Sequence, residues 1–586
     1  MFLQTDRPQT GFASVDKPWL KYYSEEAINA ALPECTIYEY LMANNRDYPG
    51  DVAISYFSRK ITFGELFKQI DRCANALSAI GVKPGEIVTV ALPSIPEALY
   101  LVYALNKIGA VANMIHPLAG ENEIIHYLNE VNSRVAFLFD GTYRIIQNSI
   151  HQTGVEKAII ITAGESLPAG LKVFFRLKTG SLKLSDKTFC TWKQFLAAGK
   201  AAKAEAAEKD IHTTAIISHT GGTTGEPKGV MCSDYNVNAL MHQIVSGFDY
   251  DRHGCSLVVL PPFINYSLVE AMLAMLAIGY ELVLIPDYKP DQFAVYLSKY
   301  HPSVVLSIPP YWEALLTCEK TEDLDLSCFE HIYYGGEGMT PEKEISINAF
   351  LTAHGSKSEL CKGLGSTELV AAATQSSPDN NMIGSVGIPL VKTNCKIVDT
   401  ITMEELPYQE NGEICFSGPS LMLGYYNHPN ETADVIKTLE NGERWLRTGD
   451  VGHLDENGVL YVTGRIKRIF MTKGRDEQIT KVFPGRVESA LSRSAAVAMC
   501  CVIGVPDAER INYPKAFVVL RNDIVQSEAV TEEILHFCRE ELPEYMVPEV
   551  VEYVDDLPRT ERGKIDYRAL EKTVVSESAD VKKSEE

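Results

Sequence analysis

A loop near the middle of the chain gathers residue types that bind phosphate. Residues 218–230 read SHTGGTTGEPKGV and follow a strand-like run. Closely spaced glycines let the backbone bend so that several N–H groups point into one concavity, while threonine hydroxyls add donors and a lysine adds positive charge. The predicted phosphate-binding residues are Thr220, Gly221, Gly222, Thr223, Thr224, Gly225 and Lys228. The alternative interpretation is a surface linker rich in glycine and threonine.

The segments around this loop alternate between strand-like and helix-like. Strand-like runs occupy residues 86–92, 256–262, 281–286, 304–308 and 331–334. Helical runs at residues 95–108 and 267–278 follow two of them. This βαβ order predicts an α/β fold with large layers and parallel sheets. Short strands and turns from residue 393 to 426 predict a small β-rich subdomain, and a compact α+β unit is predicted to end the chain.

Five more segments hold residues that could contact a nucleotide. They are YGGEG at 334–338, GLGSTE at 363–368, RTGD at 447–450, GRIKR at 464–468 and PRTERGK at 558–564. Together with the phosphate loop, and in this order, they resemble the motifs of the adenylate-forming superfamily. That superfamily comprises acyl-CoA synthetases, luciferases and the adenylation domains of peptide synthetases. The resemblance covers about residues 38–570, and six ordered motifs make coincidence negligible.

The resemblance implies the reaction that these segments serve. A carboxylate attacks the α-phosphorus of ATP while pyrophosphate leaves, so two anions must be positioned and their charge neutralised. Lys564 is expected to bridge the attacking carboxylate and the α-phosphate, and Lys228 to hold the departing phosphates. Thr220 and Glu368 are expected to hold Mg²⁺, a hard cation that prefers oxygen ligands. These four residues are the implied catalytic set.

The same resemblance implies the contacts to the nucleoside. Asp450 would accept both ribose hydroxyls, a natural role for an ionised carboxylate, and Arg465 would donate to the ribose. Leu364 stands where the family usually has an aromatic residue on the adenine, so we expect weaker nucleotide binding. The residues implied along the adenine are Gly336, Glu337, Gly338, Leu364, Gly365, Ser366 and Thr367.

Lys467 is implied to be the hinge of a two-part molecule. In the resembling family, the residue two positions after the ribose-contacting arginine is the pivot of the C-terminal domain, so that two half-reactions share one site. We therefore predict an N-terminal AMP-binding domain at residues 1–466 and a small mobile α+β domain at residues 467–575. Residues 576–586 are charged and rich in serine, and are predicted to be a disordered tail. An exposed charge without a special role is the alternative for Lys467.

The composition limits the partners. The chain has 54 Lys and Arg against 77 Asp and Glu, a formal net charge of −23 that repels nucleic-acid phosphates and anionic lipids. We therefore expect no nucleic-acid partner and no membrane insertion. The densest positive cluster lies at residues 464–486 and would suit an anionic ligand. Thirteen scattered cysteines and no signal-peptide pattern predict reduced thiols in a cytoplasmic protein.

The leading functional hypothesis is an acyl-CoA ligase that uses ATP, Mg²⁺ and coenzyme A, an acid-thiol ligase that releases AMP and pyrophosphate. One alternative is an acyl-AMP ligase that loads a carrier protein, because residues 475–481 lengthen the face that should meet the thiol. Another, from a different class, is a non-catalytic relative that binds nucleotide. An oxygenase of luciferase type would share the first half-reaction.

A fatty or aromatic acid without an amine is favoured as the substrate. Ile264 replaces a histidine of the family's motif at the border of the acyl pocket, and neither Ile264 nor Asn265 carries a charge that could pair an amino group. Several apolar and aromatic residues nearby predict an apolar pocket or, equally, an ordinary core. They are Phe263, Tyr266, Tyr311 and residues 272–278.

Overall fold

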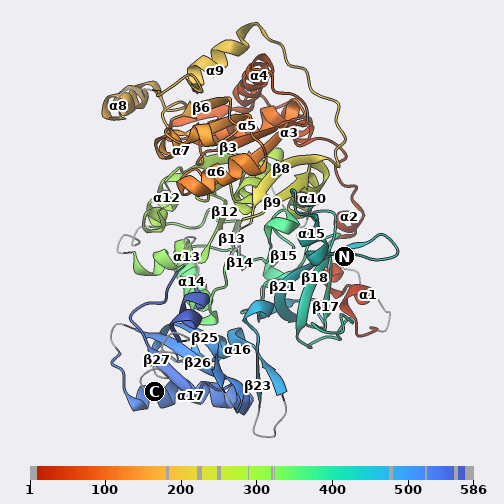
Figure 1. Cartoon of the computed structure of the whole chain (residues 1–586), viewed down its shortest axis with the longest axis vertical. Helices are drawn as coiled ribbons and strands as arrows, with labels where there is room; N and C mark the ends of the chain where they lie inside the picture. Colours follow the sequence, from red (N-terminus) through yellow and green to blue (C-terminus); the bar gives the residue numbers. More distant parts are fainter. Residues whose placement is uncertain are drawn as a thin grey trace.

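The computed structural model describes residues 9–179, 184–220, 227–246, 252–287, 289–318, 321, 324–473, 479–507, 509–521, 524–559 and 565–574. Within these ranges the chain is a mixed α/β protein, so the predicted fold class is confirmed. The N-terminal part carries two large sheets and a smaller antiparallel one, and the C-terminal part lies at one end of the molecule (Figure 1).

One large sheet runs in the order β19-β9-β8-β4-β3-β5-β6-β7. The strands from β8 to β7 are parallel, whereas β9 and β19 pair in antiparallel fashion at the edge. The strand predicted at residues 86–92 is β3. The bounds are β3 (Ile87–Ala91), β4 (Val111–Met114), β5 (Val135–Phe139), β6 (Lys157–Ile161), β7 (Phe189–Thr191), β8 (Thr214–His219), β9 (Gly229–Ser233) and β19 (Gly424–Tyr425).

The other large sheet runs in the order β14-β13-β12-β10-β11-β1-β2, and all its pairs except β1–β2 are parallel. Its strands β10 to β13 confirm four predicted strands. Most of their residues are buried and apolar, as expected where helices cover both faces of a sheet. The bounds are β1 (Val52–Tyr56), β2 (Arg59–Thr62), β10 (Cys255–Val258), β11 (Glu281–Leu284), β12 (Val304–Ser307), β13 (His331–Tyr334) and β14 (Cys361–Lys362).

The helices of the N-terminal part lie between the strands in sequence and pack on the sheets. The predicted helix at residues 95–108 is α5, which starts at a proline because the first helical position needs no N–H donor. The bounds are α1 (Ala13–Asp16), α2 (Glu25–Asn29), α3 (Ile37–Asn45), α4 (Phe63–Ala79), α5 (Pro96–Lys107), α6 (Glu121–Glu130), α7 (Asp140–Ile146), α8 (Ala169–Thr179), α9 (Trp192–Ala198), α10 (Asp234–Ser246), α12 (Phe293–Tyr300), α13 (Pro309–Thr317), α14 (Pro341–Ala353) and α15 (Pro429–Val435).

The helix predicted at residues 267–278 differs in form from the expectation. Its first nine residues are the π-helix η4 (Tyr266–Ala274), and only α11 (Met275–Ala277) continues with α-helical geometry. All residues from Ser267 to Ala277 are buried, as predicted. The π-helical register is rare and is frequently found at functional sites, and it places Glu270 in the interior.

A small antiparallel sheet runs in the order β17-β18-β21-β20, with β22 beside β21, which confirms the predicted β-rich subdomain. Two short strands, β15 (Thr374–Gln375) and β16 (Ile388–Pro389), pair nearby. The bounds of the small sheet are β17 (Asn394–Val398), β18 (Gly412–Ser417), β20 (Ile436–Thr438), β21 (Arg444–Leu454) and β22 (Leu460–Arg465).

The C-terminal part has its own core. Buried residues between Val482 and Val574 form two clusters, apart from those that span residues 13–460. The domain boundary at Lys467 stays a prediction. The elements are the hairpin β23 (Phe470–Lys473) and β24 (Ile479–Val482), the sheet β25 (Val497–Asp507), β26 (Ile511–Leu520) and β27 (Val550–Tyr553), and the helices α16 (Pro484–Leu491) and α17 (Glu528–Glu541).

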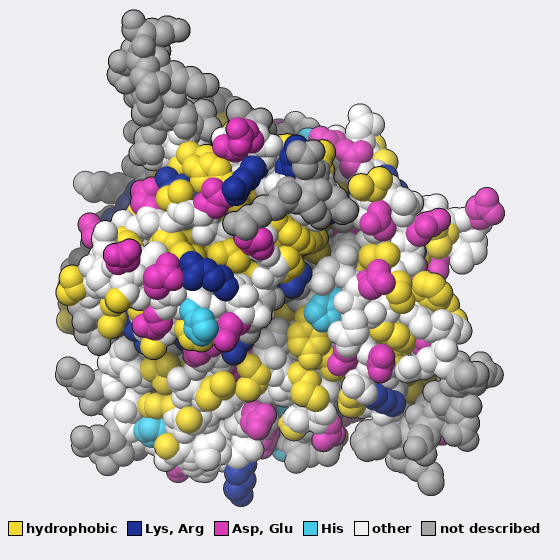
Figure 2. Space-filling view, turned by 90° about the horizontal axis from the view of Figure 1, so that it is seen from below, with side chains coloured by type: hydrophobic (Ala, Val, Ile, Leu, Met, Phe, Trp, Pro, Cys, Tyr) yellow, Lys and Arg dark blue, Asp and Glu magenta, His cyan; other side chains and the backbone are white. Residues whose placement is uncertain are grey.

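The surface mixes charges of both signs. Figure 2 shows the lower face, where Asp and Glu side chains are scattered among Lys and Arg side chains. Among the described residues, no helix is both long enough and apolar enough to cross a membrane. All thirteen cysteines lie in the described ranges, and each is a free cysteine there.

Candidate active site

The two described ends of the phosphate loop close on each other between β8 and β9. The Thr220 N–H donates to the Lys228 carbonyl at 3.0 Å, and the Lys228 N–H donates to the Thr220 hydroxyl at 3.1 Å. These bonds continue the β8–β9 ladder beyond its last pair, His219 and Gly229, so the loop has a fixed base. The predicted residues Gly221, Gly222, Thr223, Thr224 and Gly225 lie outside the described residues.

Tyr425 connects the base of this loop to Glu368. The Lys228 ammonium lies 5.0 Å from the centre of the Tyr425 ring, and the Tyr425 hydroxyl donates to the Glu368 carboxylate at 2.7 Å. Burial and the neighbouring carboxylate raise the pKa of Tyr425, so it stays a donor. Two residues predicted for one reaction therefore flank a tyrosine that the sequence analysis missed.

The segments predicted to follow the adenine leave from the carboxyl ends of neighbouring parallel strands, β13 and β14. Ligands of open α/β sheets bind at this edge. A Cβ on Gly335 would lie 3.5 Å from both the Gly363 carbonyl oxygen and the Tyr266 ring, so the two segments lie next to each other at this point. Gly336, with a φ of +80°, lies exposed at this edge, as do Glu337 and Gly338.

A buried ion pair ties these two strand ends together. Lys362, the last residue of β14, pairs with Glu344 of α14, and both side chains are buried. Glu344 also accepts a hydrogen bond of 3.4 Å from the hydroxyl of Tyr334, the last residue of β13. One carboxylate thus positions the starts of both segments.

The GLGSTE segment turns back sharply after Gly363. A Cβ on Gly365 would lie 1.8 Å from the Ala371 carbonyl oxygen, so only glycine fits there. Leu364 packs half-buried against the main core, where one face of its side chain can still cover a ring. The Ser366 hydroxyl is buried and has no hydrogen-bond partner in the described part of the chain, as expected of a group that binds a ligand. Thr367 opens the short turn that carries Glu368.

Val370 stores backbone strain next to Glu368. Its φ of +64° and ψ of −58°, with the Ala371 N–H donating to the Leu369 carbonyl at 2.8 Å, define a γ-turn that a β-branched residue rarely adopts. Such strain costs of order 1–3 kcal/mol and persists only where the surrounding structure enforces it, often at active sites or ligand-binding sites. The turn reverses the chain so that residue 372 pairs with Gly365.

The predicted ribose residues face each other across β21 and β22. The Arg465 Nε lies 2.7 Å from an Asp450 carboxylate oxygen, and the two residues are register partners. The buried carboxylate of Glu413 fixes the RTGD turn. It forms an ion pair with Arg447 at 2.6 Å and accepts a hydrogen bond from the Gly449 N–H at 3.1 Å. Glu413 is a positioning residue that the motif comparison did not include.

Lys467 lies exposed in the turn η8 (Ile466–Arg468). It stands between Arg465, which is bound to the N-terminal part, and Arg468, which is bound to the C-terminal part. On the N-terminal side Arg465 pairs with Asp450. On the C-terminal side Arg468 forms a two-pronged ion pair with Glu488 of α16 and donates to the Val502 carbonyl at 3.3 Å. The predicted catalytic Lys564 lies outside the described residues, so its position relative to this site stays a prediction.

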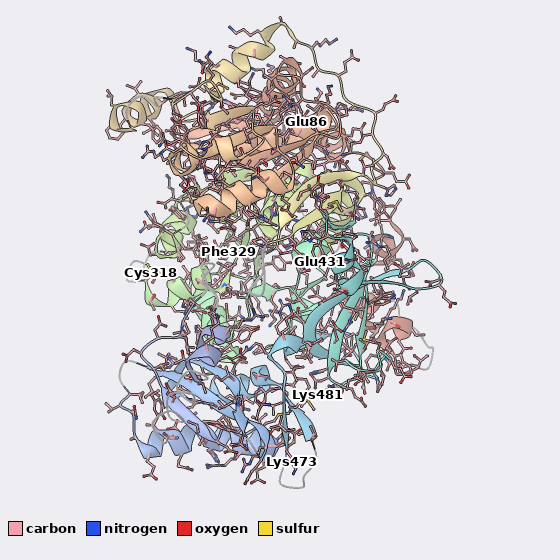
Figure 3. The ribbon with its side chains drawn as sticks, viewed as in Figure 1. Glu86, Cys318, Phe329, Glu431, Lys473 and Lys481 are labelled. Atoms are coloured by element: carbon pink, nitrogen blue, oxygen red, sulfur yellow. The ribbon has the colours of Figure 1, made fainter. Side chains whose placement is uncertain are left out.

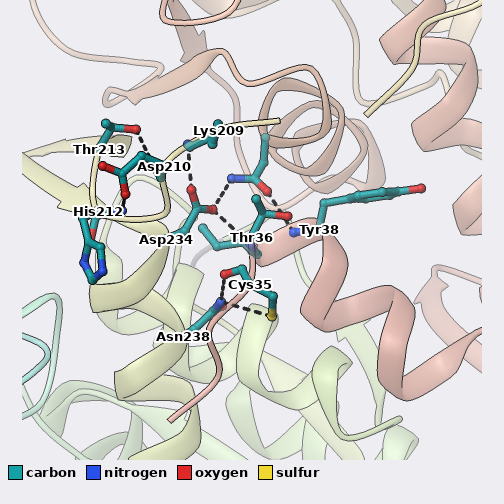
Figure 4. A network of polar contacts seen from close by, with 12 residues as sticks. Cys35, Thr36, Tyr38, Lys209, Asp210, His212, Thr213, Asp234 and Asn238 are labelled. Carbon is teal, nitrogen blue, oxygen red and sulfur yellow. Dashed lines mark hydrogen bonds and ion pairs between the residues drawn. The ribbon is translucent and has the colours of Figure 1, made fainter. Parts of the chain in front are cut away.

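A buried polar network supports the strands that carry the phosphate loop (Figure 4). Lys209, just before β8, lies 2.6 Å from the carboxylate of Asp234, just after β9, and the Asp234 side chain is fully buried. Asp234 also accepts the Ile37 N–H at 2.9 Å and the Asn106 amide at 2.6 Å. The network therefore clamps α3 and α5 to the two strands at the end away from the loop.

Part of the basic cluster at residues 464–486 lies in the hairpin β23–β24, where Figure 3 shows Lys473 and Lys481. The Lys481 ammonium donates to the Thr400 hydroxyl of the small antiparallel sheet's loop at 2.7 Å. The tip of the hairpin, residues 474–478, lies outside the described residues, so the predicted role of residues 475–481 stays a prediction.

The residues predicted for an acyl pocket divide into two groups. Tyr311 and residues 272–277 belong to the buried core, which favours the core interpretation for them. Phe263 and Tyr266 are half-buried, and Phe263 lies 4.4 Å from the ring of His116. Ile264 is 40 % exposed, and Asn265 is buried and bonded to Ser218 at 2.5 Å. Ser218 lies in β8, so this apolar region borders the strand that leads into the phosphate loop.

Glu270 is a fully buried carboxyl on η4 that packs behind the GLGSTE segment. Burial raises its pKa to about 8, although the Ala372 N–H donates to it. It is therefore protonated in the folded protein at pH 7 and ionised in the unfolded chain, whose ordinary value is 4.5. Between these two values the folded state holds one extra proton, so rising pH lowers the free energy of unfolding.

We expect Glu270→Gln to remove this pH dependence. Over the two units from pH 5.5 to 7.5, the wild-type protein should lose about 2 kcal/mol more of its free energy of unfolding than the variant. Urea unfolding of both proteins at each pH measures the difference. Parallel pH profiles would show that Glu270 ionises within the folded protein and would contradict the expectation.

The comparisons with known proteins cover nearly the same range as the motifs. The model of the AMP-binding enzyme family matches residues 41–426, and that of the AMP-binding enzyme C-terminal domain matches residues 486–564. The chain belongs to the AMP-binding enzyme family. The predicted superfamily is confirmed, as is the prediction of an enzyme of the acid-thiol ligase class.

Named members of this family match this chain over nearly its whole length. A long-chain-fatty-acid–CoA ligase of Bacillus subtilis (strain 168) is 30 % identical, covering 94 % of this chain and 97 % of the relative. A probable 4-coumarate–CoA ligase 1 of Dictyostelium discoideum is 26 % identical, covering 93 % and 96 %. The ATP-bound structure of MatB from Rhodopseudomonas palustris has a TM-score of 0.78 at 22 % identity, covering 92 % and 99 %, and shows the shared fold.

Proposed function

We propose that this AMP-binding enzyme activates a carboxylic acid as an acyl-adenylate with ATP and transfers the acyl group to coenzyme A. The main support for this proposal is the cluster at the base of the phosphate loop, where Lys228 and Glu368 flank Tyr425. A cation for the departing phosphates thus lies near a carboxylate that can hold a metal ion, beside strand ends that suit a nucleotide.

The proposed nucleotide contacts follow from the geometry around this cluster. Asp450 and Arg465, fixed by Glu413 and the β21–β22 register, would bind the ribose. The adenine would lie along residues 336–338 and 364–367, where the buried Ser366 hydroxyl is available to a ligand. The oxygen atoms of Thr220 and Glu368 suit Mg²⁺, which would neutralise phosphate charge when bound. In the first step Lys228 would hold the departing pyrophosphate while Lys564 orients the attacking carboxylate.

We propose a long-chain fatty acid as the substrate and coenzyme A as the thiol. The B. subtilis relative is named a long-chain-fatty-acid–CoA ligase, and its match spans nearly the whole of both chains. Ile264 and Phe263 supply an apolar border near the phosphate loop, and Asn265 is already bonded to Ser218 rather than free for an amino group. An aromatic acid is the second candidate, because another relative is named a 4-coumarate–CoA ligase.

Product analysis by mass spectrometry tests this proposal. The purified protein, ATP and Mg²⁺ are incubated with a pool of fatty, aromatic and amino acids, with and without coenzyme A. We expect long-chain acyl-CoA and AMP to appear only when coenzyme A is present. An acyl-adenylate that accumulates equally in both reactions would point to a carrier protein as the acceptor instead. Neither product, in a protein that binds ATP, would contradict the proposed activity.

A further inference from the structure

Helix α8 exposes an apolar face that the fold leaves uncovered. Leu171, Val173, Phe174 and Leu177 are 43 %, 60 %, 65 % and 80 % exposed. Successive helical residues are about 100° apart, so these four side chains share an arc of roughly 160°. The half-buried Phe175, from another face, packs against the main core, and a Cβ on Gly164 would lie 2.6 Å from its ring. The helix is therefore fixed to the domain with its apolar arc facing outward.

The segment around α8 reverses the charge of the chain. Residues 165–203 contain eight Lys and Arg and two Asp and Glu, whereas the whole chain has a net charge of −23. A cavity of about 830 Å³ lies beside the helix, and several cations line it. They are Arg59, Arg72, Lys172, Lys193 and Lys200. Charges act over about 8 Å at physiological salt, so this local excess decides what the segment meets, not the net charge of the whole chain.

Figure 1 shows α8 at the outer edge of the molecule, beside α9 and away from the C-terminal part. Access to this surface therefore does not depend on where the C-terminal part lies. The helix has only 11 residues, too few to span a bilayer, but a short amphipathic helix can lie in the plane of a membrane surface.

We infer that α8 and the basic residues around it dock the protein on an anionic lipid bilayer. The apolar arc would enter the boundary between headgroups and acyl chains, and Lys193 and Lys200, both exposed, would meet lipid phosphates. Nucleic acid would use the charge but leave Phe174 and Leu177 in water. This proposal differs from the expectation that an acidic chain avoids anionic lipid, because it rests on the local charge of one segment. Docking would also give access to acids dissolved in the bilayer, a consequence that rests on the proposed function.

Co-sedimentation of the full chain with lipid vesicles tests the inference. We expect binding to vesicles that contain phosphatidylglycerol, and at least about tenfold weaker binding to vesicles of phosphatidylcholine alone or at high salt. The double variant Phe174→Ser, Leu177→Ser should lose at least about tenfold in affinity for the anionic vesicles, because it removes the exposed apolar anchors. Lys193→Glu with Lys200→Glu should lose both the affinity and its salt dependence.

A matched control separates the anchor from general surface apolarity. Ile401 and Val525 are 79 % and 82 % exposed in two loops far from α8 in the sequence, so Ile401→Ser with Val525→Ser should bind vesicles like the wild-type protein. Adenylate formation from a short, soluble acid without vesicles should be unchanged in all three double variants. Equal vesicle binding by the α8 variant and the wild type would overturn the inference. So would a change in oligomeric state, seen in sedimentation velocity, without any change in vesicle binding, since α8 would then face a second copy.

Discussion

Replacing Lys564 with alanine is expected to slow adenylate formation by about 10²–10³-fold, the usual effect of removing one group that stabilises developing charge. The lysine is proposed to contact the attacking carboxylate and the α-phosphate together, where two anions meet. Thioester formation from supplied acyl-adenylate should largely survive, because no phosphorus is attacked in that step. Pyrophosphate release measures the first step, and acyl-CoA appearance from the supplied adenylate measures the second.

Lys467→Pro is the matched contrast for the same two assays. Proline fixes φ and removes an N–H, so it would hold the linker between Arg465 and Arg468 in one orientation. We expect the two steps to respond unequally, one retained and the other lost. An equal loss in both steps would contradict the hinge, and full rates in both steps of the Lys564 variant would remove that lysine from the mechanism.

Asp234→Ala is expected to lower the free energy of unfolding by about 3–5 kcal/mol, because it leaves the Lys209 ammonium buried without its carboxylate. The variant also removes the acceptor for the Ile37 N–H and the Asn106 amide. Urea unfolding measures the loss. Adding Lys209→Met should recover part of it, since the uncompensated charge disappears.

The exposed pair of Asp287 and Lys289 is the control for this prediction. Their side chains are 60 % and 56 % exposed, and the ions lie 2.8 Å apart, close to the separation in the buried pair. Asp287→Ala should leave the free energy of unfolding unchanged, because water screens the pair. Similar losses in the two variants would show that burial is not the source of the effect.

The sequence was sufficient where structure depends on neighbouring residues. The strand at residues 331–334 has a local sequence signal, and the structure confirms it as β13. The glycines of the GLGSTE segment are also a local signal, and the structure places that segment directly after β14. The residues that position the site contact partners far away in the sequence. Glu413 meets Arg447 across 34 residues, and Tyr425 meets Glu368 across 57. No local pattern encodes such pairs, because the tertiary fold creates them: β18 pairs with β21, and β19, which carries Tyr425, pairs with β9.

The same limit explains why the sequence analysis did not foresee the form of the helix or the local basic segment. Apolar residues in a row predict a buried helix but not its π-helical register, which depends on what Glu270 and Tyr266 pack against. The net charge of −23 describes the whole chain, whereas residues 165–203 oppose it. A window of that length would have revealed the basic segment, and helical periodicity would have revealed the arc of Leu171, Phe174 and Leu177.

The ion pairs of Arg465 and Arg468 leave only a short linker around Lys467 in which the two parts of the molecule could rotate against each other. Arg465 is held by Asp450 and Arg468 by Glu488, so Ile466 and Lys467 are the residues between the two fixed points. Two residues offer only about four soft torsion angles. If the two orientations have similar free energies, a difference in affinity for successive ligands would suffice to set which orientation prevails. The ligand bound in the active site would then determine the orientation of the C-terminal part.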